Sequence, residues 1–376
     1  MNIYAGCFVI LLFTGKWAAA QHTSPVDPLY GNEEYETITT LYEQRAADFS
    51  EMDSVQTARS YLLQQKTEKA RQLFYALYTH HPDHTGYLIQ LLNASNTLYH
   101  YSFIYTTAIR ALTEQKHHKA IYHYAVIASK KLDRKEEAFE YALKGQQLFP
   151  SDPRLTLDLA TELQERSLYD SSLTILLPVL AKDTGQLGLL EKAVKAYYMQ
   201  NEFKNAVILA NYLLSRDIYS NTVLIYQLYS YYEAKQYKST VDLVGRLLQA
   251  DQYSAGMLLV GAKAAAALKN YTLSNEWLYR GREELTDKQD VAFLHQLAEN
   301  AAAQRQFDLA AKFYDTSIYI YRMPFSYYLK GVNYMEAGKK ELAIRQFDRY
   351  KTHPLVRKDT TATNQKILKY INSVSR

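Results

Sequence analysis

Several residue types that would define other classes of protein are scarce in this sequence. There is one cysteine, Cys7, and it lies in an N-terminal segment that we expect to be removed. The remaining chain would then form no disulfide bonds and no thiolate metal sites. Only 13 glycines and 8 prolines occur in 376 residues. No apolar run approaches the roughly 20 residues of a membrane-spanning helix, so we expect no stable membrane span.

An excess of one charge is also absent. The chain has 43 Lys and Arg against 39 Asp and Glu, and both signs are interspersed along it. A nucleic-acid-binding surface would gather its basic residues in one stripe, so we expect no nucleic-acid partner. Glycine-rich phosphate loops and the motifs G-x-S-x-G and H-E-x-x-H are missing as well. We therefore expect a protein that is not an enzyme and needs no cofactor.

What the sequence does contain is a small or apolar residue that recurs at an almost constant interval. Successive positions are 34, 34, 34, 34, 34, 34, 36 and 33 residues apart: Ala70, Ile104, Ala138, Ser172, Ala206, Thr240, Ser274, Ala310 and Ala343. We call these nine residues the anchors. A period of this length is typical of helix pairs that are too small to bury their own apolar faces and therefore stack. The sequence predicts an all-α fold.

Other residue types recur as well when the chain is divided into units in which each anchor is the twentieth residue. The units then start at Glu51, Thr85, Lys119, Pro153, Leu187, Asn221, Ala255, Val291 and Pro324. Three residues before the anchor stand Tyr101, Tyr169, Phe203, Tyr237, Tyr271 and Phe307. With these columns the chain from Glu51 to Pro354 resembles the tetratricopeptide repeat family, in about nine tandem repeats. The resemblance implies a right-handed α-α superhelix, or solenoid, whose first helices line a concave groove.

The two ends of the chain differ from the repeats. Residues 1–20 combine a short apolar run, Ile3 to Phe13, with a run of small residues, Ala18 to Ala20, and predict a secretory signal peptide. An uncleaved anchor and a chance apolar N-terminus are the alternatives. We expect residues 21–50 to be a flexible leader and an N-terminal capping helix, residues 51–356 the nine repeats, and residues 357–376 a C-terminal capping helix. The protein would be exported to the periplasm, the cell envelope or the exterior.

The resemblance also implies which side chains line the groove. The selected residues are Asn93, Asn96, Lys130, Lys195, Tyr198, Tyr229, Tyr232, Lys263, His295 and Tyr328. Tyrosine supplies flat apolar area and lysine supplies charge, which together suit an extended peptide or a sugar chain. The alternative is that these tyrosines are ordinary helix-surface residues.

These features predict an exported scaffold or adaptor that binds a protein or peptide partner in its groove. A glycan-binding module that uses the groove tyrosines is one alternative. A second is a metal-binding protein, because histidines from His80 to His123 lie close to one another in the sequence and imidazole is a common metal ligand. Loop histidines are more often ordinary polar turn residues, and we expect no metal site.

Overall fold

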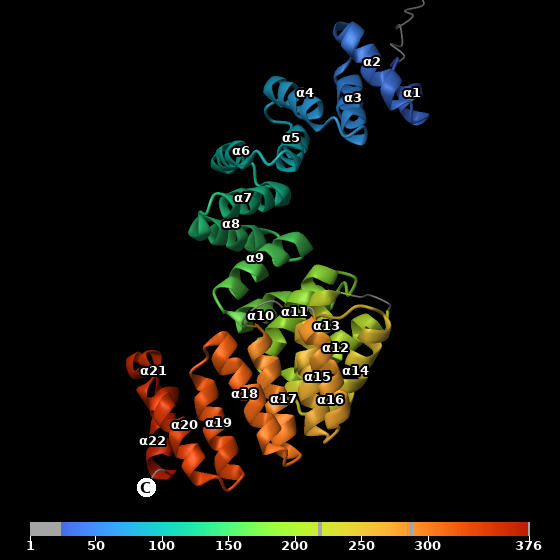
Figure 1. Cartoon of the computed structure of the whole chain (residues 1–376). Helices are drawn as coiled ribbons and strands as arrows, with labels where there is room; N and C mark the ends of the chain where they lie inside the picture. The colour runs from blue at the N-terminus through green and yellow to red at the C-terminus, as the bar shows by residue number, and fades with distance from the viewer. Residues whose placement is uncertain (1–23, 217–219, 284, 286–288, 375–376) are drawn as a thin grey trace, which may run out of the picture. The chain divides into compact units, whose positions relative to one another are not determined.

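The computed structural model describes residues 24–216, 220–283, 285 and 289–374 (Figure 1). These residues form helices and no strand, which confirms the all-α class. The expected signal peptide, residues 1–20, lies outside the described residues. None of the helices in the described ranges is long and apolar enough to cross a membrane. The chain divides into two compact units, residues 1–162 and 163–376.

Helices of similar length make up most of both units. The first unit contains α1 (Asp27–Gly31), α2 (Tyr35–Arg45), a 3-10 turn (Ala46–Asp48), α3 (Glu51–Leu63), α4 (Thr67–His80), α5 (Thr85–Thr97), α6 (Tyr101–Thr113), α7 (Lys119–Lys131) and α8 (Lys135–Leu148). The boundary between the units falls near the end of α9 (Pro153–Glu165). The second unit contains α10 (Tyr169–Leu180), α11 (Leu187–Met199), α12 (Phe203–Leu214), α13 (Asn221–Glu233), α14 (Tyr237–Gln249), α15 (Ala255–Ala267), α16 (Tyr271–Glu283), α17 (Asp290–Ala303), α18 (Phe307–Tyr321), α19 (Phe325–Glu336), α20 (Lys340–Thr352), α21 (Pro354–Lys358) and α22 (Ala362–Val374).

The anchors lie in the second helix of each repeat, and all nine have an exposed fraction of 0%. Small side chains at these positions let two helices approach closely, which is why the spacing revealed the repeats. Within the second unit, the first helices of neighbouring repeats also contact each other, from α11 to α13, α15 and α17 (Figure 1). The structure thus has the tandem repeats that the sequence predicted.

Each hairpin turns through one residue with a left-handed backbone. These residues have φ between 57° and 72° and follow the anchor spacing: Gln65, Tyr99, Asp133, Ser167, Asn201, Lys235, Lys269, Arg305 and Gly338. The next N–H donates to the carbonyl five residues earlier, as Lys66 does to Tyr61 at 2.8 Å. This bond satisfies a carbonyl that the end of the first helix leaves without a partner.

The N-terminal segment is anchored earlier than the sequence indicated. Residues 24–31, expected to belong to a flexible leader, include helix α1, and the side chain of Val26 is fully buried. The hydroxyl of Ser24 donates to Asp53 of α3, and Gln56 of α3 donates to the carboxylate of Asp27 at 2.7 Å. These contacts hold the segment against the first repeat.

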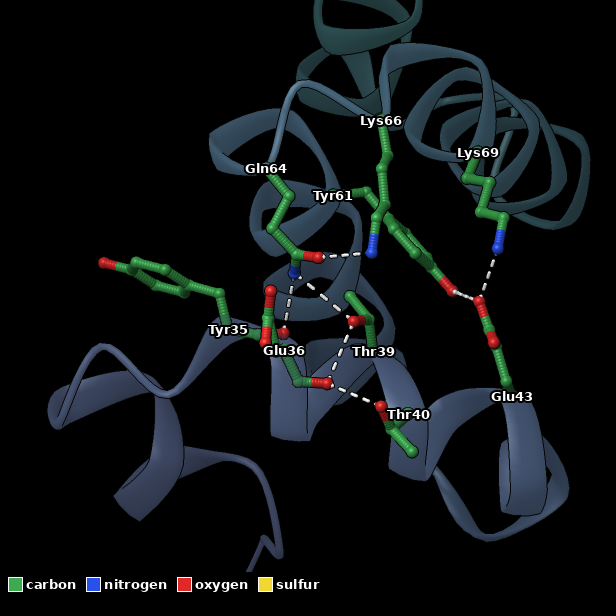
Figure 2. Close-up of polar contacts among 9 residues, drawn as sticks. All are labelled: Tyr35, Glu36, Thr39, Thr40, Glu43, Tyr61, Gln64, Lys66 and Lys69. Atoms are coloured by element: carbon green, nitrogen blue, oxygen red, sulfur yellow. Dashed lines mark hydrogen bonds and ion pairs between the residues drawn. The ribbon is translucent and has the colours of Figure 1, made fainter.

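Helix α2 buries Ile38 and also contacts the first repeat through polar side chains (Figure 2). The carboxylate of Glu43 accepts a hydrogen bond from the hydroxyl of Tyr61 at 3.0 Å and lies 2.5 Å from the Nζ atom of Lys69. At the other end of the contact, the amide nitrogen of Gln64 donates to the carbonyl of Tyr35 at 2.8 Å. The ammonium of Lys69 and the hydroxyl of Tyr61 hold the pKa of Glu43 below its ordinary value.

A Lys269→Gly substitution should stabilise the protein, because glycine adopts the left-handed conformation without a Cβ penalty. We expect the free energy of unfolding to rise by about 0.5 kcal/mol. This gain is the Cβ penalty that glycine avoids, less the extra conformational entropy that a glycine backbone loses on folding. Lys312→Gly, in the interior of α18, is the matched control and should lower it by about 1 kcal/mol. Denaturant titration measures both, and a loss of stability in the first variant would contradict the role of the turn.

A Glu43→Gln substitution should loosen α2, because the neutral amide loses the ion pair with Lys69. Hydrogen exchange of residues 35–45 at neutral pH should accelerate, whereas Glu36→Gln should leave it nearly unchanged. The wild-type protein should show the same loosening in acid. Because the pKa of Glu43 is lowered in the fold, its contribution is present at neutral pH and is lost as the pH falls below about 4. Equal protection in both variants would contradict this assignment.

Candidate partner-binding surface

The ten groove residues chosen from the sequence divide between the two units. Asn93 and Asn96 lie on α5 and Lys130 lies on α7, all in the first unit. The other seven lie on α11, α13, α15, α17 and α19 of the second unit.

In the first unit two lysines and one histidine of α7 contact acids at or near α9. The Nζ atom of Lys130 lies 2.8 Å from the carboxylate of Glu162, whose side chain is only 2% exposed. His123 contacts Asp158 at 2.6 Å, and Lys119 contacts Asp152 at 2.9 Å. Lys130 therefore joins two repeats, and its expected role as a partner-binding cation stays a prediction.

The two asparagines of α5 occupy different positions. Asn93 is exposed, and its side-chain oxygen accepts a hydrogen bond from the hydroxyl of Tyr124 at 3.1 Å. Asn96 is half-buried on the same helix. Asn93 is thus engaged with Tyr124 of α7, and we base no binding surface on this pair.

In the second unit, aromatic side chains of α11 and α13 gather around Tyr198. The centroid of its ring lies 5.3 Å from that of Tyr226 and 6.1 Å from that of Tyr229. All three are half-buried, as is Tyr232 farther along α13. Burial raises the pKa of Tyr198, Tyr226 and Tyr232, so these phenols remain neutral at physiological pH. The cluster offers apolar ring area together with hydroxyl groups that can donate and accept hydrogen bonds.

Two lysines accompany this cluster, Lys195 on α11 and Lys263 on α15, and both are half-buried. Neither forms a hydrogen bond or an ion pair with another residue in the described part of the chain. We define the tyrosine surface as these two lysines with Tyr198, Tyr226, Tyr229 and Tyr232. It combines aromatic rings with cations whose hydrogen-bonding capacity is open to a ligand.

One carboxylate adjoins the tyrosine surface. Burial raises the pKa of Glu299 on α17, and the charge of Lys263 partly opposes this rise. The side chain of Glu299 is nevertheless exposed. The charge of Glu299 also contributes to the raised pKa of Tyr232, which places the two near each other.

His295 and Tyr328 are engaged in packing between hairpins. The Nε2 atom of His295 is 2.8 Å from the hydroxyl of Ser326 and 3.3 Å from that of Ser317. The ring of Tyr328 lies 5.9 Å from Tyr350 and 5.5 Å from Phe325. Packing within the fold thus accounts for the positions of both side chains without a binding partner. We leave both residues out of the tyrosine surface.

The histidines near the start of the chain also have local partners. His84 accepts from the backbone N–H of Tyr87 at 3.4 Å and stacks on its ring, and His118 accepts from the N–H of Ala120 at 3.1 Å. Each histidine caps the N-terminus of a helix in this way, His84 that of α5 and His118 that of α7. Across the described ranges, no three His, Cys, Asp or Glu side chains lie close enough together to hold a metal ion.

Tyr226 was missed by the sequence reasoning, which took groove positions from the repeat family. It precedes Tyr229 by three residues, and residues three apart share a helix face. The pattern Tyr226, Tyr229, Tyr232 was therefore a readable signal of one aromatic face along α13.

The protonation of His295 should make the second unit sensitive to acid. Burial lowers its pKa to about 4, against about 6.5 in an unfolded chain. The unfolded state therefore binds a proton first as the pH falls from about 6.5 to about 4, and the free energy of unfolding should drop by about 1 to 3 kcal/mol. Stability above pH 6.5 should be unaffected.

Denaturant titration at several pH values measures this effect. His295→Gln keeps a hydrogen-bonding side chain but cannot titrate, so its stability should depend less on pH across this window. His81→Gln, at an exposed position, is the control. An unchanged pH slope in His295→Gln would contradict the prediction.

Comparison with known proteins gives no sequence relative that identifies the chain. No protein-family model matches it. No curated protein matches it either.

Solved structures with a similar arrangement of helices are distant. A tetratricopeptide repeat protein from Parabacteroides merdae is 10% identical over 66% of this chain and 97% of its own, with a TM-score of 0.45. The human IFIT1 dimer with m7Gppp-AAAA is 12% identical over 85% of this chain and 94% of its own, with a TM-score of 0.40. Naa15/Naa10 bound to HypK-THB is 13% identical over 92% of this chain and 58% of its own, with a TM-score of 0.35.

At these identities and scores, none of the ligands of those proteins can be transferred to this one. The assignment of the repeats depends instead on the chain itself. The nine anchors are fully buried and the nine left-handed turns repeat in the same register. The chain is an all-α array of tandem tetratricopeptide-like helical hairpins.

Proposed function

We propose that this protein is an exported, non-enzymatic scaffold or adaptor that binds a protein or peptide partner on the tyrosine surface. The observation that carries the proposal is the cluster of Tyr198, Tyr226 and Tyr229, on a surface whose two lysines form no hydrogen bond or ion pair within the described residues. Tyrosine is enriched where proteins bind one another, because a large rigid ring loses little conformational entropy on binding.

The charges favour a partner segment of mixed character. Lys195 and Lys263 would pair with carboxylates, and Glu299 would pair with a basic side chain. Apolar side chains of the partner would pack against the tyrosine rings between these charges. Peptides carry such mixtures of charged and apolar groups, whereas a neutral glycan would leave both lysines without an ionic partner.

Export is supported by the sequence alone, through the apolar run and the small residues of the first 20 positions. An exported scaffold would work in the periplasm, at the cell envelope or outside the cell, as part of a larger assembly. Fractionation of the native host and sequencing of the mature N-terminus would test this part of the proposal. A cytosolic protein with an intact N-terminus would refute it.

Chemical cross-linking in the native host, followed by mass spectrometry, tests the binding surface. The Tyr229→Ala/Tyr232→Ala variant should lose at least tenfold of the cross-linked partner, because aromatic residues at interface centres commonly contribute about 2 kcal/mol or more each. Tyr75→Ala/Tyr279→Ala removes two tyrosines of second helices that are about half exposed and should capture as much as wild type.

Thermal unfolding of each variant shows whether a loss of capture reflects loss of fold. Equal capture by wild type and the Tyr229→Ala/Tyr232→Ala variant would contradict the tyrosine surface. Retention of the wild-type protein on a glycan array, abolished by the same double substitution, would replace the peptide partner with a carbohydrate.

A further inference from the structure

A second surface lies at the C-terminal end of the second unit, on helices that the tyrosine surface does not use. The start of α19, the end of α20, helix α21 and the start of α22 surround a pocket of about 300 Å³. Its lining includes Phe325, Tyr350, Leu355, Val356 and Ile367. We call it the C-terminal pocket. Figure 1 shows the four helices together at this end of the chain.

The walls of the C-terminal pocket are fixed by one buried amide. The side chain of Asn364 is 2% exposed and lies at the start of α22. Its nitrogen donates to the carbonyl of Val356 at 3.1 Å and to that of Asp359 at 2.7 Å. Its oxygen accepts from the hydroxyl of Tyr350 at 2.8 Å. Three segments are thus tied to a single residue, so the pocket is formed before any ligand arrives.

Large apolar side chains remain exposed at the rim. Leu355 is 64% exposed and Phe325 is 41% exposed, and both also line the pocket. A concave apolar site with exposed apolar rims is the arrangement that binds a protruding apolar side chain.

The lining of the pocket contains one charged residue, Asp359, but the chain segment that forms α21 and α22 is mainly basic. Residues 354–374 contain four Lys or Arg and a single acidic residue, Asp359. Arg322, Arg357 and Lys358 are exposed and make no side-chain hydrogen bond or ion pair with any other residue that the structure describes. The carboxylate of Asp359 already accepts the backbone N–H of Thr361 at 2.9 Å. None of the three cations belongs to the lining itself, but Arg357 and Lys358 directly follow the lining residue Val356, and Arg322 precedes the lining residue Pro324 by two positions.

We propose that the C-terminal pocket is a second docking site, which binds a protein segment that presents one large apolar side chain flanked by acidic residues. The apolar side chain enters between Phe325 and Leu355, and the acidic residues pair with Arg322, Arg357 and Lys358. Charge complementarity selects an acidic segment. The concave centre selects a protruding side chain over a flat lipid surface, which would leave the pocket unfilled.

This site goes beyond the tyrosine surface and is independent of it. A scaffold with two separate sites can hold two partners at once, or one partner at two points, and gains avidity when both are filled. The proposal for either site stands even if the proposal for the other is wrong.

Site-specific photo-crosslinking tests the proposal in the full-length chain in its native host. A benzoylphenylalanine placed at position 355 should cross-link to a protein segment with a large apolar residue and at least two acidic residues within three positions of it. Arg357→Glu/Lys358→Glu should reduce the yield at least tenfold. Tyr229→Ala/Tyr232→Ala should leave it unchanged, which separates this site from the tyrosine surface. The same photo-reactive group at position 279, on α16, is the control for exposure alone.

Other outcomes would overturn the proposal. These are cross-links to lipid, to a second copy of this chain or to segments without acidic residues, the absence of any cross-link, and an unchanged yield after charge reversal. If Arg357→Glu/Lys358→Glu lowers the melting temperature, the milder Arg357→Gln/Lys358→Gln replaces it. That variant should still reduce the yield at least threefold, and a wild-type yield would overturn the proposal as well.

Discussion

The close approach of two helices at each anchor is the constraint on which the rest of this structure depends. Every anchor is fully buried, and the residue four positions later is buried as well. Side-chain volume is balanced between the two positions where the anchor is large. Ile104 is followed by Ala108, whereas Ala70 is followed by Phe74. A larger residue at either position would overpack a contact that has no space to expand, at a cost of about 1 to 3 kcal/mol.

The lysines of α7 and those of the tyrosine surface differ in how the fold uses their charges. In the first unit, cations of α7 are bound to acids at or near α9, so their electrostatic energy stabilises the repeats themselves. In the second unit, Lys195 and Lys263 form no such pair within the described residues. Charged side chains that the fold does not use are available for recognition. This contrast, more than the number of tyrosines, distinguishes the surface proposed to bind a partner.

The sequence revealed the repeats because helix packing requires small residues at a fixed interval, and residue size can be read from a sequence. Most of the left-handed turns were hidden, since residues such as Tyr99 and Lys235 carry no signal of positive φ, whereas Gly338, Asn201 and Asp133 do. The ion pair of Lys130 was equally hidden. Its partner, Glu162, lies 32 residues away, and its position depends on how two repeats stack. The periodicity predicts the architecture. The side-chain partners depend on the rotation between neighbouring repeats, which cannot be read from residues at equivalent positions.

The left-handed turns have a further consequence for how such a chain can change over time. Their conformation is held by hydrogen bonds between main-chain atoms, and all nine residues are exposed. Chemically unrelated side chains already occupy them, from Asp133 to Tyr99 to Arg305. Each repeat therefore carries one position where evolution can exchange charge, aromaticity or size without disturbing a buried contact. Spaced once per repeat, these positions allow the surface of the array to diversify while its packing stays constant.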